Sequence, residues 1–187
     1  MTVFVRIIFL RFNMRFFFVS ILSICIMGLV SAFPRSSDIG HRSSIIRQPS
    51  TINRSAFYKA MEGNNKELVN EQLTELTSAP PDLKDAFMGT MILKQAGLGG
   101  SPTTKLHLFK EGHKMLETAI KQNPDNAEFR FLRLMIQENA PGVLGYKNDI
   151  QKDSEFIRKS YKLLPEDVQH AIVDYNKKSK VLKLEVS

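Results

Sequence analysis

The stretch that decides the fold of this chain is TKLHLFKEGHKMLETAIKQNPDNAEFRFLRLMIQEN, residues 104–139. In its first half, apolar or semi-polar side chains recur every three or four residues. This spacing places them in one stripe along a single face of a helix. The members of this stripe are Leu106, Phe109, His113, Leu116 and Ile120. The second half, residues 126–139, is apolar except for a narrow polar edge, so we expect it to be the most buried helix.

Helical patterns continue on both sides of this stretch. They cover residues 52–62, 65–77, 83–97, 104–122, 126–139, 147–164 and a last segment from Glu166 onward. Glycines, prolines and asparagines separate them, as expected of helix stops followed by caps. No strand pattern competes, so the sequence predicts an all-α domain of about six or seven helices.

A weak internal repeat organises these helices. Pro124-Asp125 and Pro165-Glu166 lie 41 residues apart, and Pro81-Asp82 falls about one period earlier. Each unit holds a helix, a Gly/Pro loop and a second helix. This arrangement predicts stacked antiparallel helical hairpins.

The end of one unit resembles a tetratricopeptide repeat. Leu116, Ala119 and Ile120, followed by residues 124–127, are similar to the second helix and boundary of that repeat, and Gly89 matches the small residue of its first helix. The resemblance covers roughly residues 81–164, with a longer period and without the Trp and Tyr signature. It implies a concave helical surface that holds a peptide, a partner protein or a small ligand, and no chemistry of its own.

The N-terminus reads as a secretory signal peptide. Residues 16–32 (FFFVSILSICIMGLVSA) are uncharged, follow Arg15, and end in the small-residue pattern that signal peptidases accept, which predicts cleavage before Phe33. Met14 is an alternative start to Met1, since it gives a signal of conventional length. On the basis of this signal and of residues 131–146, the chain as a whole resembles short exported helical proteins of Gram-negative bacteria.

Three regions follow from this interpretation. Residues 1–32 are the signal peptide, residues 33–51 a flexible basic linker, and residues 52–187 the helical-hairpin domain. We expect an exported chain, periplasmic or secreted. The alternative is an uncleaved anchor that tethers the same domain to the membrane, because residues 16–32 are at the short end of what spans a bilayer.

Cysteine use and charge exclude several function classes. Cys25 is the only cysteine and lies in the predicted signal, so the mature chain has no thiol chemistry and no disulfide. Removing the three arginines of the signal from the 26 basic residues leaves 23 against 19 acidic ones, and the excess lies in residues 33–56 and 177–187. A nucleic-acid platform would instead place charge on a structured face, so we expect no nucleic-acid partner.

Four residues are the candidates for ligand contact. They are Arg130, Arg133, Gln137 and Tyr146. The first three form the polar edge of the most apolar helix, where two arginines one turn apart are suited to pairing with a carboxylate. The alternative is that Asp149, Asp153 or Glu155 satisfies the arginines internally.

The apolar loop at residues 143–146 has two interpretations. Val143, Leu144 and Tyr146 either cap the core or present an adhesive patch.

Catalytic and metal sites have little support. Two histidine–glutamate pairs have the i, i+4 spacing at which one helix face can bind a metal ion: His107 with Glu111, and His113 with Glu117. The two pairs lie on different faces of the helix. No nucleophile elbow or zinc-protease motif occurs. We therefore expect an exported binding or scaffolding module without cofactor or catalysis, whose partner is a protein or peptide of the cell envelope. The alternative is an envelope enzyme with an unfamiliar site at His113 and Glu117.

Overall fold

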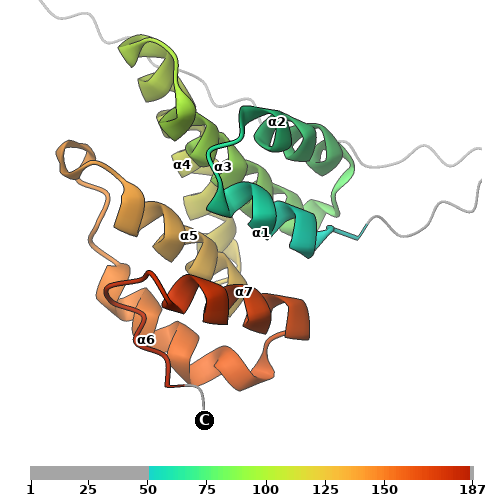
Figure 1. The fold of residues 1–187 in the computed structure, drawn as a ribbon, viewed down its shortest axis with the longest axis vertical. Helices are drawn as coiled ribbons and strands as arrows, with labels where there is room; N and C mark the ends of the chain where they lie inside the picture. The colour runs from blue at the N-terminus through green and yellow to red at the C-terminus, as the bar shows by residue number, and fades with distance from the viewer. Residues whose placement is uncertain (1–50, 186–187) are drawn as a thin grey trace, which may run out of the picture. The chain divides into compact units, whose positions relative to one another are not determined.

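The structure is a computed structural model that describes residues 51–185. The predicted signal peptide and all of the predicted linker except Thr51 lie outside the described residues. The elements are α1 (Arg54–Glu62), α2 (Lys66–Glu75), η1 (Leu76–Ser78), α3 (Pro81–Leu98), α4 (Pro102–Gln122), α5 (Ala127–Asn139), η2 (Gly142–Leu144), α6 (Ile150–Ser160), η3 (Tyr161–Leu163) and α7 (Glu166–Asn176). Figure 1 shows their arrangement.

The predicted all-α class is confirmed for residues 51–185, with seven α-helices. Helices α3 and α4 form one antiparallel packed pair and α5 and α6 form another, so the expectation of antiparallel pairs is also confirmed. Within this part of the chain, no helix combines the length and the apolar character that crossing a bilayer requires.

Side-chain caps set most helix starts. The side chains of Asn53, Asn65 and Asn126 accept hydrogen bonds from backbone N–H groups in the first turns of α1, α2 and α5. Helices α3 and α4 begin two residues before the predicted starts, at Pro81 and Pro102, because proline fits the first helical turn. The predicted helices 65–77 and 147–164 are shorter than expected and end in the 3₁₀ turns η1 and η3.

Helix α5 forms the centre of the domain. Ten of its 13 residues are buried, which confirms it as the most buried helix. Of its apolar side chains, Phe131, Leu132 and Leu134 are fully buried, and Ile136 is partly buried. The expected polar edge is buried as well, because α6 covers it.

Helices α3 and α4 approach closely at two glycines. A Cβ atom added to Gly89 would lie 2.8 Å from the carbonyl oxygen of Gly112, and one added to Gly112 would lie 2.5 Å from that of Gly89. Neither distance is compatible with a real side chain. The two glycines therefore allow backbone-to-backbone contact between the helices.

Residues 177–185, in the basic C-terminal region, pack against the domain. Helix α7 ends at Asn176, and the side-chain amide of Asn176 both donates to the carbonyl of Leu184 (2.9 Å) and accepts from its N–H (2.9 Å). Arg158 of α6 donates to the carbonyl of Leu182 at 2.9 Å, and the side chain of Leu182 is 0% exposed. This segment leaves its lysines at the surface and adds one leucine to the core.

A buried carboxylate joins the first helix to the central one. Glu128 of α5 accepts from Arg54 Nε at 2.8 Å, from Arg54 Nη2 at 3.0 Å and from the Tyr58 hydroxyl at 2.9 Å. Helix α7 packs against both α1 and α5. In an open stack, each hairpin contacts only its neighbours, so this return of α7 to α1 is a feature of tertiary packing that the repeat did not predict.

Candidate functional site

The two candidate arginines of α5 converge on one carboxylate of α6. Asp153 is 0% exposed and accepts from Arg130 Nη1 at 3.0 Å, from Arg133 Nε at 2.7 Å and from Arg133 Nη2 at 2.8 Å. Arg130 also donates to the carbonyl of Pro124, and its guanidinium lies 4.4 Å from the ring centroid of Phe156. The internal ion pairs considered as the alternative are therefore present, and Asp153 is their centre.

Arg133 extends this network to α4 and to the loop after α5. Its Nη1 atom lies 2.8 Å from Glu117 Oε2 and 3.5 Å from Asp149 Oδ2. The hydroxyl of Tyr146 donates to the other oxygen of Glu117 at 2.5 Å. Burial, and then the hydrogen bond to Glu117, raise the pKa of Tyr146, so this phenol stays a neutral donor. Tyr146 thus caps the network from the loop.

Gln137, one turn beyond Arg133, is 0% exposed, and its amide nitrogen and oxygen have no hydrogen-bond partner within residues 51–185. As ligand contacts, the four sequence candidates stay a prediction. The structure gives three of them a structural role and leaves Gln137 without a polar partner.

A small cavity of about 350 Å³ lies beside this network. Gln137, Tyr146, His113 and Glu117 are among the residues that line it. The cavity brings together the two residues of the enzyme hypothesis, but both oxygens of Glu117 are already held by Arg133 and Tyr146. His113 lies between Phe109 and Tyr146, with ring centroids 5.7 Å and 4.5 Å away. This geometry favours aromatic packing over proton transfer.

The other histidine pair is at the surface. His107 Nδ1 lies 3.9 Å from Glu111 Oε2, and both side chains are largely exposed. No group of three potential metal ligands occurs in the described part of the chain.

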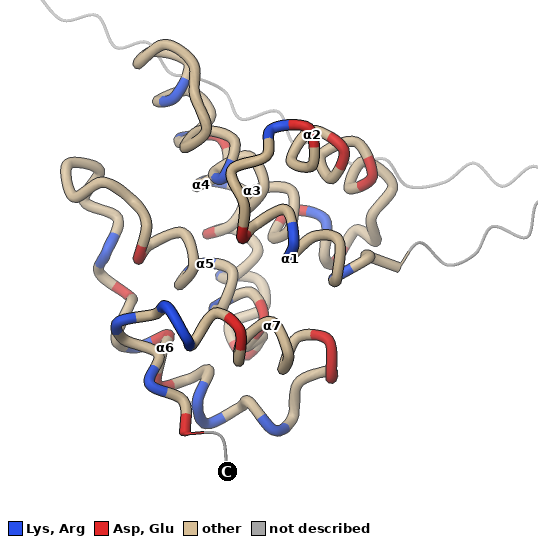
Figure 2. The backbone as a smooth tube through the Cα atoms, in the orientation of Figure 1, with Lys and Arg blue, Asp and Glu red and all other residues tan. Residues whose placement is uncertain are grey.

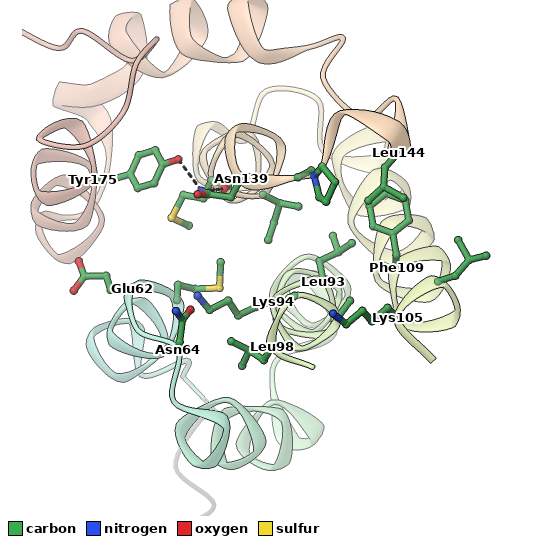
Figure 3. A pocket seen from close by; sticks show the side chains of 18 of the residues that line it. Glu62, Asn64, Leu93, Lys94, Leu98, Lys105, Phe109, Asn139, Leu144 and Tyr175 are labelled. Carbon is green, nitrogen blue, oxygen red and sulfur yellow. Dashed lines mark hydrogen bonds between the residues drawn. The ribbon is translucent and has the colours of Figure 1, made fainter. Parts of the chain in front are cut away.

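A larger groove of about 680 Å³ opens on the other side of α5. Figure 3 shows it between α5 and α3, with side chains from α1 and α7 at one end and from α4 and the loop after α5 at the other. Its apolar lining includes Leu93, Leu98, Phe109, Met135, Ile136 and Leu144. Its volume falls in the range of about 300–1,000 Å³ that is usual for ligand sites.

The rim of this groove carries exposed apolar side chains. Leu106 is 46% exposed, and Val143, in the loop after α5, is 93% exposed. In the described part of the chain, Leu163 on η3 is the other strongly exposed large hydrophobic residue, at 87%, and it does not line the groove. Two of these three residues therefore gather at one opening.

The charged lining of the groove is mostly basic. It contains Lys94, Lys105 and Lys178 against Glu62, and none of the four forms an ion pair with another residue of the described range. Burial, and then the charge of Lys178, lower the pKa of Lys94. Elsewhere, Figure 2 shows acidic and basic residues interspersed along the helices.

Some residues of this groove were already indicated by the sequence, in the loop at residues 143–146 and in the stripe of α4. Of the two interpretations of the loop at residues 143–146, capping of the core agrees with the burial of Tyr146, and the adhesive patch stays a prediction for the exposed Val143. The predicted stripe of α4 is fully buried only in its second half, at Leu116 and Ile120, and its first residue, Leu106, lies at the groove. No sequence signal pointed to Lys94, because a lone lysine in a helix is ordinary.

The described residues form an all-α domain with a large, mostly apolar groove. Comparisons with known protein families, with curated proteins and with solved structures find no match. What the domain does must therefore be argued from its geometry.

Proposed function

We propose that this chain is an exported binding module, without catalysis of its own, which holds a peptide segment of a partner protein in the groove between α3 and α5. The observation that carries the proposal is the grouping of Leu106 and Val143 at the mouth of a large apolar groove. Exposing such residues to water costs free energy that a bound partner recovers.

The nature of the rim favours a partner with more surface than a small ligand has. Val143 is 93% exposed, so a molecule confined to the groove would leave most of its side chain in water. A peptide can fill the groove and cover the rim as well. The proposal also extends the resemblance to tetratricopeptide repeats, which implies a helical surface that binds peptides.

Export is the second part of the proposal and rests on residues 16–32. N-terminal sequencing of the chain recovered from its native cell should begin at Phe33. An intact N-terminus on a membrane-bound chain would favour the tethered alternative, and an intact N-terminus in the cytosol would contradict export.

Peptide selection tests the binding role. The protein is expressed from the sequence of residues 1–187, immobilised, and exposed to a random peptide library displayed on phage. We expect selected peptides to lose binding to Val143→Asp and Leu106→Asp, because a charge at the rim opposes an apolar partner. Leu163→Asp is the matched control, since Leu163 is similarly exposed but lies outside the groove. Recovery of no peptide, or equal loss with all three variants, would reject the proposal.

A further inference from the structure

The middle of the groove holds a lysine without an anionic partner. Lys94 is half-buried on α3 and makes no hydrogen bond or ion pair with any residue between 51 and 185. Figure 3 shows its side chain lying in the groove, between Glu62 and Asn64 on one side and Lys105 and Phe109 on the other. A cation among apolar groups loses hydration that only an anion or several polar groups can replace.

The surrounding charges increase this cost. Lys178, just after α7, is close enough to repel Lys94, and both effects act on the pKa of Lys94 in the same direction, downward. Glu62 is the one acidic residue in the groove lining and forms no ion pair with Lys94. A ligand carboxylate near Lys94 and Lys178 would therefore meet two cations that form no ion pair within the described range, of which Lys178 also lies 5.3 Å from the ring centroid of Tyr175.

We propose, building on the peptide-binding role above, that the groove selects segments in which an acidic side chain stands between apolar ones, with its carboxylate bound by Lys94 and Lys178. The apolar residues on either side of the acid lie against Met135 and Ile136 and against Phe109 and Leu106. Lys105, at the α4 end, offers a second site for negative charge.

The positions of the lysines and side-chain amides in the groove favour a peptide over a fatty acid, which has a single polar group. Lys94 and Lys105 lie at different places along the groove (Figure 3), so one terminal carboxylate bound at Lys94 would leave Lys105 unpaired. The groove also contains the side-chain amide of Asn64 and the side-chain oxygen of Asn139, whose amide nitrogen already donates to the Met135 carbonyl and the Tyr175 hydroxyl. Amides donate to and accept from a peptide backbone, which a hydrocarbon chain does not have.

The composition of the selected peptides is the first test. We expect enrichment of Asp or Glu flanked by apolar residues, relative to the unselected library. Peptides that depend on Val143 and Leu106 but show no acidic enrichment would overturn this inference and leave the binding role intact. A library that gives no binder rejects both.

The second test measures how much the peptide carboxylate contributes to affinity. A selected peptide and its amide version, with Asp→Asn or Glu→Gln, are titrated against the chain and against Lys94→Gln and Lys178→Gln. The amide peptide should bind the unchanged chain about tenfold more weakly, the scale of a lost charge-assisted hydrogen bond. On Lys94→Gln, the two peptides should bind alike.

A control variant and the second groove variant complete the experiment. Lys114→Gln removes an exposed lysine of α4 that does not line the groove, and it should preserve the difference between the two peptides. Lys178→Gln changes an exposed residue and therefore reports on charge even if Lys94→Gln disturbs folding. An undiminished peptide difference in both groove variants, or displacement of every peptide by palmitate at lower concentration, would overturn the inference.

Discussion

At the scale of single residues, Gly89 and Gly112 show how the absence of a side chain determines packing. Each has the carbonyl oxygen of the other within 3 Å of the place where a Cβ atom would be. Because a backbone carbonyl cannot swing away as a flexible side chain can, any larger residue must separate α3 from α4. This contact also positions Leu93, which follows Gly89 by one turn and lines the groove.

The glycine contact gives the first prediction. Gly89→Ala should lower the free energy of unfolding by about 1–3 kcal/mol through overpacking, as measured by urea denaturation. Gly97→Ala is the control, because Gly97 lies in the same helix and nothing would contact its Cβ within 4 Å. There, the better helix propensity of alanine should stabilise the domain by about 0.5–1 kcal/mol. Equal effects at the two positions would refute the close contact.

Gln137 gives the second prediction at this scale. Its buried amide has no hydrogen-bond partner in the described part of the chain, so replacing it with methionine, which has a similar shape, removes a desolvation cost. Gln137→Met should raise the free energy of unfolding by about 1 kcal/mol in urea denaturation.

Gln72→Met is the comparison for this variant. Gln72 is also buried, but its amide donates to Glu75 at 2.9 Å, so the same change there should destabilise the domain. A loss of stability with Gln137→Met would mean that the amide is satisfied in solution.

At the scale of elements, the ion network explains how two polar surfaces can pack together. Arg130 and Arg133 on α5 would be costly to bury alone, and so would Asp153 on α6. Because Arg130 and Arg133 each donate to Asp153 at 3.0 Å or less, each helix supplies the charge that the other requires. The pair α5·α6 is thereby held in one register.

The third prediction concerns this pair. Asp153→Asn should lower the free energy of unfolding by about 3–5 kcal/mol, because buried Arg130 loses its only carboxylate partner in the described range and Arg133 keeps only Glu117 and Asp149. Asp174→Asn removes a carboxylate that pairs with Lys177 at 2.7 Å, but on the surface, and should leave the melting temperature almost unchanged. Calorimetry of both variants distinguishes them, and a small effect at Asp153 would contradict a buried pair.

At the scale of the whole domain, three buried phenols connect helices that are distant in sequence. Tyr58 of α1 donates to Glu128 of α5, Tyr146 donates to Glu117 of α4, and the hydroxyl of Tyr175 on α7 accepts from Asn139. Burial is the main cause that raises the pKa of each, and neighbouring carboxylates add to it. In the folded domain, each of the three phenols therefore stays neutral to a higher pH than a free phenol does.

This pattern predicts alkaline unfolding. A folded-state pKa above the ordinary value of 10.0 means that stability is complete below that pH and decreases as the pH rises past it, because the unfolded chain ionises first. Urea denaturation between about pH 8 and pH 11 should show this decrease. Tyr58→Phe should make it shallower, and a slope identical to that of the unchanged chain would refute the contribution of Tyr58.

The helices could be predicted from the sequence because the features that determine each helix lie within or next to that helix. Asn53, Asn65 and Asn126 act as caps within a few residues of their own positions, and the apolar spacing of α4 and α5 depends on one helix at a time. The predicted class, the antiparallel pairs and the central role of α5 follow from such short-range patterns.

The groove depends on tertiary structure alone. Its ends come from α1 with α7 and from α4 with the loop after α5, and these segments are brought together by long-range contacts such as Arg54 and Tyr58 with Glu128. No local pattern encodes those distances. For the same reason, Lys94 is an ordinary residue in sequence, and only the packed helices make it a lone cation in a groove. The sequence indicates Val143 as an apolar loop residue, but only the packed helices place it at the rim of that groove.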